Sequence, residues 1–244
     1  MEWIHRFHRG PRCTVSRQRG MKRQGGSIAF GRVSFFFALS LGSVEGLAFE
    51  NGDVQYWNLT QLQKSLSARW KAFFAEDLRW GDRASEFYFH RPEAGLVYRT
   101  SKSISFCISY KEIHTRESGD WKTIRIPNGS IIFDAKAAGL EVMNRNRLEF
   151  MDQVNGTNAW RYRGLVYAYF PWRLPWIGSQ PYVGDELFYH FNGDRLKFNR
   201  IYAGLRTRIA YAIQLDTYYL IHHIRSRGEW TIQHVLGTRL MIQI

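Results

Sequence analysis

Long runs in which apolar and polar residues alternate constrain the fold of this chain most strongly. Residues 103–113, SISFCISYKEI, place Ile104 and Phe106 on one face of an extended segment and Ser105 and Cys107 on the other. Successive side chains of a β-strand point to opposite faces, whereas a helix repeats every 3.6 residues. The alternation therefore predicts two-faced strands, and the mature chain contains no comparable helical pattern.

Ten segments share this alternation and are predicted to be strands: residues 66–80, 86–100, 103–114, 121–136, 139–152, 157–170, 180–192, 196–207, 209–225 and 229–244. An earlier segment, Asp53–Lys64, also has strand character. It is either an eleventh strand, part of a set of twelve, or a periplasmic lead-in.

Strand length separates a membrane barrel from a soluble sandwich. About 9 to 11 tilted residues cross the apolar layer of a membrane. Strands of soluble proteins are commonly about 5 to 6 residues long, and the segments in this chain are longer. We therefore expect an all-β fold, a transmembrane antiparallel up-and-down β-barrel of about ten strands, with twelve as the alternative. The other interpretation of the many aromatic residues is the core of a soluble sandwich.

Tryptophans near the ends of the predicted strands fit the aromatic girdles of such a barrel. They are Trp80, Trp121, Trp160, Trp172, Trp176 and Trp230. The last strand alternates through Ile244, as is typical of strands that the barrel-assembly machinery recognises, although outer-membrane barrels usually end in an aromatic residue.

The predicted connections alternate in length. Short turns fall at Thr100–Lys102, at Ala137–Gly139 and around Arg208, and longer polar loops fall at GDRAS, HTRESGD, DQVNGT, NGDR and RSRG. Tight periplasmic turns and longer loops on the other side are typical of outer-membrane barrels. We therefore expect the tight turns in the periplasm.

Residues 1–48 are interpreted as a basic leader with a secretion signal that is removed. Met21 opens a basic stretch, an apolar run follows from about Val33 to Val44, and the small residues Gly46 and Ala48 suit a signal peptidase. Residues 1–20 are interpreted either as a disordered basic extension or as preceding the true start, Met21, and residues 49–244 are expected to form a single barrel domain. The other reading of the apolar run is a buried helix.

The leader also accounts for much of the charge. The whole chain carries +13, and removing the eight bases and two acids of residues 1–48 leaves 26 and 19, a net charge of +7. Cys13 is lost with the leader, so Cys107 alone remains and cannot form an internal disulfide. We expect a monomer in the outer membrane of a Gram-negative bacterium, in contact with outer-membrane lipid and with no nucleic-acid partner.

If one face of each strand meets lipid, charged side chains collect on the inward face. A narrow barrel of about ten strands is filled by such side chains, and we expect a lumen charge network that pairs across neighbouring strands. Its members are Arg145, Arg147, Glu149, Arg161, Arg163, Glu186, Arg200 and Arg239. The network either only holds the barrel closed or leaves a path for an anion or other ligand.

Two acidic residues conflict with this pattern, because Glu76 and Asp185 fall on the lipid face. A charge at the bilayer midplane costs about 2 kcal/mol or more. We therefore expect these residues at rims or beside bulges, unless the predicted register is one residue out.

No catalytic motif stands out. An alternative function, a lipid- or lipopolysaccharide-modifying enzyme, would use His222, His223 and Asp216, but their spacing identifies no triad. The sequence has no metal-ligand cluster and no nucleotide motif, so no cofactor is expected. A third hypothesis is a soluble, exported, basic β protein that binds polyanions through its arginines.

Four segments, NRNRLEF, WRYRGLVYAYF, GDELFYHFN and FNRIYAGL, follow one another in residues 144–205. In this order they resemble the bacterial family known as domain of unknown function 2490. The resemblance spans most of residues 53–244. It implies an exported β protein with an Arg-x-Arg-x-Glu strand, an Arg-rich strand, a Glu-x-Phe strand and an Asn-Arg strand, and it implies no activity. Asp185 stands where the family pattern suggests Asn.

Overall fold

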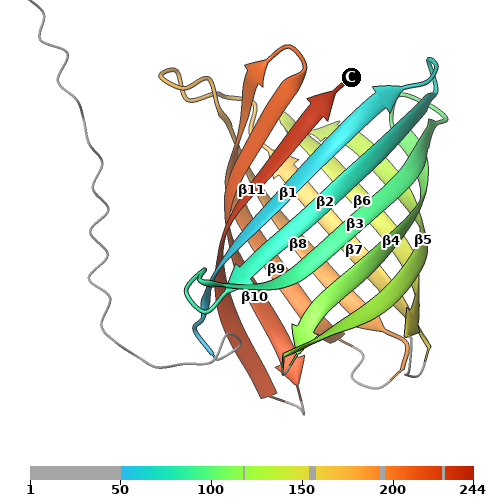
Figure 1. The fold of residues 1–244 in the computed structure, drawn as a ribbon. Helices are drawn as coiled ribbons and strands as arrows, with labels where there is room; N and C mark the ends of the chain where they lie inside the picture. Colours follow the sequence, from blue (N-terminus) through green and yellow to red (C-terminus); the bar gives the residue numbers. More distant parts are fainter. Residues whose placement is uncertain (1–50, 118, 154–157, 193–195, 227–228) are drawn as a thin grey trace, which may run out of the picture. The chain divides into compact units, whose positions relative to one another are not determined.

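The structure is a computed structural model that describes residues 51–117, 119–153, 158–192, 196–226 and 229–244, all in one compact unit. The described chain forms a closed barrel without helices, which confirms the predicted all-β barrel (Figure 1). Its strands are β1 (Val54–Ser65), β2 (Trp70–Gly81), β3 (Glu86–Arg99), β4 (Ile104–Glu117), β5 (Asp120–Ala137), β6 (Leu140–Gln153), β7 (Ala159–Tyr169), β8 (Gln180–His190), β9 (Leu196–Ala210), β10 (Ile213–Ser226) and β11 (Glu229–Gln243). The predicted leader, residues 1–48, lies outside the described residues.

The barrel closes through a parallel pair of strands. Strands that follow each other along the chain are antiparallel, whereas β1 pairs with β11 in parallel, with Asn58 opposite Thr238. Eleven strands are described, an odd number, so the first and last must run in the same direction. The expected up-and-down closure is therefore corrected at this seam. The segment from Asp53 to Lys64 is a strand of the barrel and not a lead-in.

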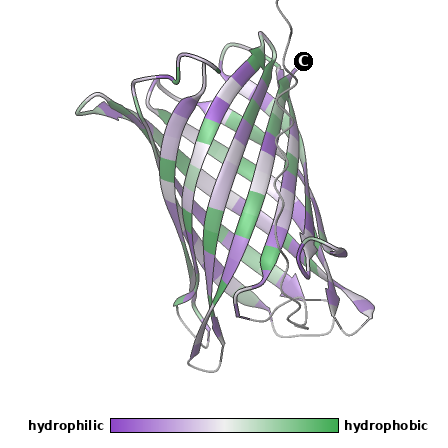
Figure 2. Cartoon of the chain, turned by 90° about the vertical axis from the view of Figure 1, so that its left-hand side faces the viewer, coloured by the Kyte–Doolittle hydropathy of each residue, from purple (hydrophilic) through white to green (hydrophobic). Residues whose placement is uncertain are grey.

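Each strand presents one face to the lumen and the other to the outside, as the alternation requires. On β7, Arg161 and Arg163 point inward and are 8% and 6% exposed, whereas Trp160 and Tyr162 point outward and are 48% and 36% exposed. Figure 2 shows the same alternation of hydrophilic and hydrophobic residues along neighbouring strands. Among the described residues, no helix is long and apolar enough to cross a membrane.

The lengths of the connections do not distinguish the two ends of the barrel. We call the end where β1 and β11 finish the C-terminal rim, and the other end the opposite rim. The longest connection between described strands, residues 170–179, lies at the C-terminal rim, where short turns were expected. At the opposite rim, β4 and β5 continue to pair as far as Glu117 and Asp120, both within the predicted HTRESGD loop. The expectation of longer loops at one rim is therefore wrong.

Aromatic side chains gather on the outer surface near the opposite rim. Tyr56, Trp80, Phe87 and Trp121 lie in a row across β1, β2, β3 and β5, with ring centroids 5.4 to 5.7 Å apart. Trp160 lies 5.1 Å from Phe150 at the same rim. The connection 170–179 carries Trp172 and Trp176, which are exposed at the C-terminal rim. The predicted tryptophans thus divide between the two rims.

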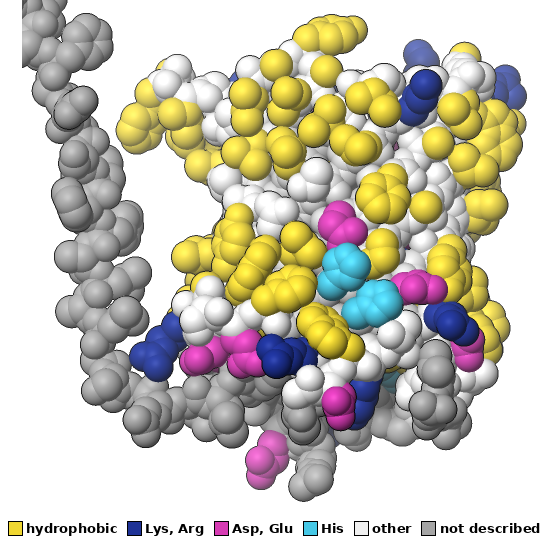
Figure 3. All heavy atoms as spheres, in the orientation of Figure 1, with side chains coloured by type: hydrophobic (Ala, Val, Ile, Leu, Met, Phe, Trp, Pro, Cys, Tyr) yellow, Lys and Arg dark blue, Asp and Glu magenta, His cyan; other side chains and the backbone are white. Residues whose placement is uncertain are grey.

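The two acidic residues that conflicted with the pattern do point outward, so the predicted register was correct there. Glu76 Oε1 lies 2.8 Å from His90 Nε2, and the His90 ring stacks on His114 at 5.4 Å. Asp185 accepts a 2.6 Å hydrogen bond from Asn199 Nδ2. Neither residue lies at a strand end. Figure 3 shows histidine and acidic side chains among apolar ones on this outer face.

Glycines let aromatic rings lie flat against the inner wall. A Cβ atom added at Gly184 would lie 2.2 Å from the Tyr167 ring, and one at Gly237 would lie 2.1 Å from the Tyr218 ring. No side chain fits at such distances. These two inward glycines therefore allow a buried tyrosine of the adjacent strand to pack directly over the backbone.

Candidate functional site

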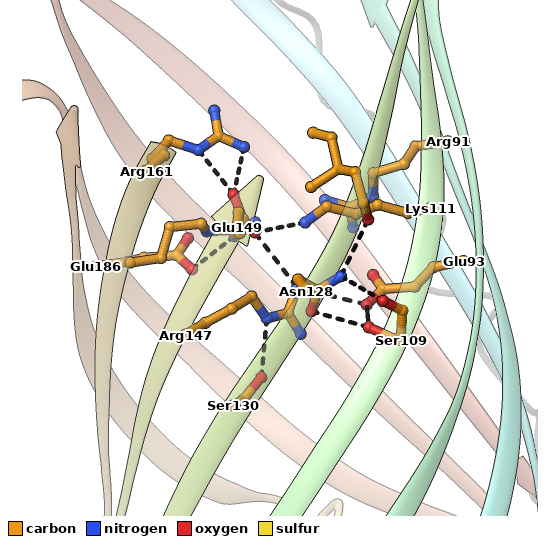
Figure 4. Close-up of polar contacts among 12 residues, drawn as sticks. Arg91, Glu93, Ser109, Lys111, Asn128, Ser130, Arg147, Glu149, Arg161 and Glu186 are labelled. Atoms are coloured by element: carbon orange, nitrogen blue, oxygen red, sulfur yellow. Dashed lines mark hydrogen bonds and ion pairs between the residues drawn. The ribbon is translucent and has the colours of Figure 1, made fainter. Parts of the chain in front are cut away.

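The centre of the lumen is a layer of charges around Glu149, which is fully buried on β6. Lys111 Nζ on β4 donates to Glu149 Oε1 at 2.5 Å. Arg161 and Arg163 on β7 bind the same carboxylate at 2.5 and 3.1 Å, and Arg147 lies 3.7 Å away. We call these five residues the Glu149 layer (Figure 4). Four cations thus share one carboxylate that has no contact with solvent.

A second buried carboxylate, Glu186 on β8, links the layer to the far wall. Arg163 Nη2 binds it at 2.7 Å, Arg200 on β9 lies 3.4 Å away, and Tyr202 donates to it at 3.1 Å. Arg145 is the least tightly held, because its Nη2 atom lies 3.6 Å from Glu186 and its side chain is 26% exposed. That distance is too long for a hydrogen bond.

Two further buried carboxylates, Glu93 on β3 and Asp77 on β2, also bind cations. Glu93 lies 3.4 Å from Arg147 and accepts a 2.7 Å hydrogen bond from Ser109 Oγ. Asp77 binds Arg79 at 2.7 Å and Arg91 at 3.0 Å. The contact between Glu93 and Arg147 joins β3 to β6, which are not neighbours in the sheet.

The fifth buried carboxylate, that of Asp216 on β10, lies among tyrosines. Arg206 binds Asp216 through Nε and Nη2, both at 3.1 Å, and donates to the Tyr169 hydroxyl at 2.7 Å. Arg239 lies 3.7 Å from Asp216 and donates to the Tyr167 hydroxyl at 3.0 Å. Tyrosine hydroxyls thus supply acceptors where carboxylates are few.

Aromatic faces hold several of the arginines. The Arg79 guanidinium lies 3.6 Å from the centre of the Trp57 ring, and Arg163 and Arg200 lie 4.4 and 4.6 Å from that of Phe188. A cation over an aromatic face is attracted by about 0.5 to 2 kcal/mol, more when it is desolvated. These rings partly compensate for the scarcity of carboxylates.

All eight residues predicted for the lumen charge network point inward, and each makes an ion pair. Glu149 is the register partner of Arg161, and Arg147 is the partner of Arg163. Sequence reasoning missed the inward aromatics. Phe188 shares a face with Glu186 by period two, so the pattern contained the signal, and Trp57 was missed because its strand was left open.

Positive charge exceeds negative charge in this network. Among the described residues below the rim, ten cations and five buried carboxylates form three groups of ion pairs with a net charge of +5. The cations are Arg79, Arg91, Lys111, Arg145, Arg147, Arg161, Arg163, Arg200, Arg206 and Arg239, and the carboxylates are Asp77, Glu93, Glu149, Glu186 and Asp216. The pair of Lys136 and Glu141 at the rim adds no net charge.

Hydrogen-bond donors are in similar excess. Nine arginines and one lysine carry about 48 N–H donors, whereas five carboxylates offer about 20 acceptor sites. In the described part of the chain, the Nε atoms of Arg91, Arg163 and Arg200 are buried without a hydrogen-bond partner. The lumen is therefore short of acceptors.

A cavity of about 810 Å³ lies on the C-terminal-rim side of the charge layer. Its lining reaches the rim at Lys102 and Lys136 and extends inward to Arg163, Glu186 and Arg200. The lumen was expected to be largely filled, and the cavity corrects this for one half. Lys111, Glu149 and Arg161 do not line it, because they fill the barrel beneath the cavity floor.

The residues considered for lipid-modifying catalysis do not come together. His222 points inward and packs against Trp57 at 5.5 Å, whereas the next residue, His223, points outward beside Trp230. Asp216 lies six residues before His222 on β10, and its carboxylate is bound by Arg206 of β9. Within the described ranges, no group of three or more His, Cys, Asp or Glu side chains could hold a metal ion.

The arginines considered for polyanion binding are also not on the surface. Arg161 and Arg163 are buried inside the barrel, and the outward side chains beside them are aromatic. A long polymer outside the barrel could not contact them.

Cys107 is a free, buried thiol on the cavity wall.

The comparisons with known proteins give a family and no further relative. Neither the curated proteins nor the solved structures contain a significant match to the chain. One family model, described as protein of unknown function (DUF2490), matches residues 54–233, which is 180 of the 244 residues. The match runs from β1 into β11 and includes every member of the network except Arg239. The chain therefore belongs to the DUF2490 family.

Proposed function

We propose that this chain is an outer-membrane β-barrel that holds a small anionic solute in its luminal cavity and is not an open diffusion pore. The observation that carries the proposal is the net charge of +5 in the ion-pair network beside a cavity of about 810 Å³. Buried charges without partners are costly. An anion in the cavity would supply the missing negative charge and the missing acceptors.

The outer surface supports the membrane part of the proposal. Large apolar side chains such as Ile108, Leu148 and Leu236 point outward and are 45% to 63% exposed. Contiguous apolar surfaces of this kind are unfavourable in water and mark contact with a membrane or a partner. Lipid around the strands, a removed leader at residues 1–48, assembly through β11 and a monomeric state together form one consistent account.

The charge layer supports the closed lumen. The side chains around Glu149 fill the cross-section beneath the cavity, and none of the described residues of the opposite-rim turns lines the cavity. A solute that enters from the C-terminal rim would meet the floor formed by Arg147, Arg163 and Arg200. The proposed role is therefore binding and not free passage.

The test has two readouts on the same protein. Membrane fractionation should place the protein with the outer membrane, with heat-modifiable migration on gels; recovery in the soluble periplasm would refute the membrane part. The melting temperature of the barrel should rise as inorganic phosphate replaces chloride at constant ionic strength, because a ligand that binds only the folded state stabilises it. An unchanged melting temperature would favour a purely structural role for the charges.

A further inference from the structure

We infer that the luminal cavity takes an amphipathic anion, a single medium-length alkyl chain that ends in an oxyanion. The inference rests on the proposed anion binding and names its ligand class. The carrying observation is the order of side chains below the mouth of the cavity, which on several strands passes from an apolar residue to the cationic floor.

Two strands show this order most clearly. On β6, the inward residue Met143 is followed toward the floor by Arg145 and then Arg147. On β11, Met241 lies nearer the rim than Arg239. Phe73 on β2, Val97 on β3 and Ile132 on β5 also line the cavity on the rim side of the charged floor. The wall thus has an apolar band above a cationic floor, and polar residues such as Lys71, Asp134 and Glu141 line the mouth on the rim side of that band.

The apolar band suits an alkyl chain. Inward residues of one strand are about 7 Å apart along it, so a band one or two inward positions deep extends roughly 7 to 14 Å. Methionine side chains are flexible and adapt to irregular apolar ligands. A cavity of about 810 Å³ lies within the usual range for small-molecule sites, which is about 300 to 1,000 Å³.

The cationic floor suits an oxyanion head group. Arg145 is held by a single ion pair of 3.6 Å and is partly exposed, so its guanidinium has donors to spare. Arg239 is 18% exposed in its side chain and its nearest carboxylate oxygen lies 3.7 Å away. Guanidinium groups bind phosphate and carboxylate through paired N–H donors. The head group would therefore contact Arg145 and Arg239, with the tail directed toward the rim.

Octyl phosphate is a direct probe of this arrangement, titrated by calorimetry into the barrel reconstituted in lipid nanodiscs and corrected for nanodiscs without protein. Inorganic phosphate tests the head group alone, octanol the tail alone, and octylammonium the opposite charge. Octyl phosphate should bind at least tenfold more tightly than phosphate or octanol, because each buried CH₂ contributes about a fourfold gain. Octylammonium should not bind beyond its partition into lipid.

Three variants separate the head site from the tail site. Arg145→Gln should weaken both anions at least tenfold, Met143→Gln should weaken octyl phosphate and leave inorganic phosphate unchanged, and Arg125→Gln, on the outer face, should change neither. Arg145 has no short hydrogen bond to lose, and heat-modifiable migration would verify that each variant is folded.

The outcomes distinguish this inference from the proposed function. Octyl phosphate that binds no more tightly than inorganic phosphate would overturn the inference and leave anion binding intact. Tight octyl phosphate binding that Arg145→Gln does not weaken would also overturn it, since partition into lipid would then explain the signal. If neither anion binds, both proposals fail.

Discussion

The two halves of the lumen solve the problem of buried charge in different ways. Beneath the cavity floor, Glu149 has no exposure and is surrounded by four cations, so its negative charge is fully used within the protein. On the rim side, Arg145 and Arg239 have only distant carboxylates and face a cavity lined by Met143 and Met241. One half is packed and locked, and the other half is open to a ligand.

This difference indicates that charge in the lumen has two roles. A carboxylate contacted by several strands fixes the barrel cross-section, because removing it leaves several cations buried without a counter-charge. A cation that has few partners costs less to change and is accessible to a solute. Stability should therefore depend on the packed half, and binding on the open half.

The largest expected effect is the loss of the Glu149 charge. Glu149→Gln should reduce the free energy of unfolding by about 3 to 5 kcal/mol, because Lys111, Arg161 and Arg163 lose their shared partner. Urea unfolding in lipid vesicles, followed by tryptophan fluorescence, measures this. Glu141→Gln is the control, because that rim residue is half-exposed and, among the described residues, pairs with Lys136 alone, at 3.3 Å. It should change the free energy of unfolding by less than about 0.5 kcal/mol. If the two variants lost equal stability, the Glu149 layer would not be the main support of the fold.

A smaller effect compares an apolar residue of the packed wall with one that lines the cavity. Leu220 is fully buried among the inner tyrosines, so Leu220→Ala should cost about 2 to 5 kcal/mol through lost packing. Met241 faces the cavity, so Met241→Ala opens no new enclosed space and should cost less than about 1 kcal/mol. The same unfolding experiment reads both variants. A similar cost for the two would mean that the rim side is packed as well.

Much of the wall of the barrel follows from period two. Alternation assigns Arg161 and Arg163 to the inside and Trp160 to the outside, and chain order places β6 beside β7, so that Glu149 meets Arg161. Even Glu76 points outward as the alternation predicts. Its carboxylate on the outer face is paired with His90, and the register of the strand is not shifted. Local rules thus predict faces and neighbouring pairs.

Contacts across the lumen do not follow from such rules. Lys111 on β4 reaches Glu149 on β6, and Trp57 on β1 lies under Arg200 of β9, because the curvature of the barrel brings distant strands together. The parallel pairing of β1 with β11 is likewise set by closure and not by alternation. The size of the cavity depends on how the inward side chains of all strands fill the interior, so the sequence of a single strand does not predict it.

The central claim is that the outer face meets lipid while one half of the lumen is open to water. Single cysteines at Met143 and Leu148, two residues of β6 on opposite faces, test it in the barrel inserted in lipid vesicles with Cys13→Ser and Cys107→Ser. A membrane-impermeant maleimide should label Met143→Cys, which lines the cavity, and should leave Leu148→Cys protected by lipid. Labelling of Leu148→Cys with protection of Met143→Cys would contradict the account.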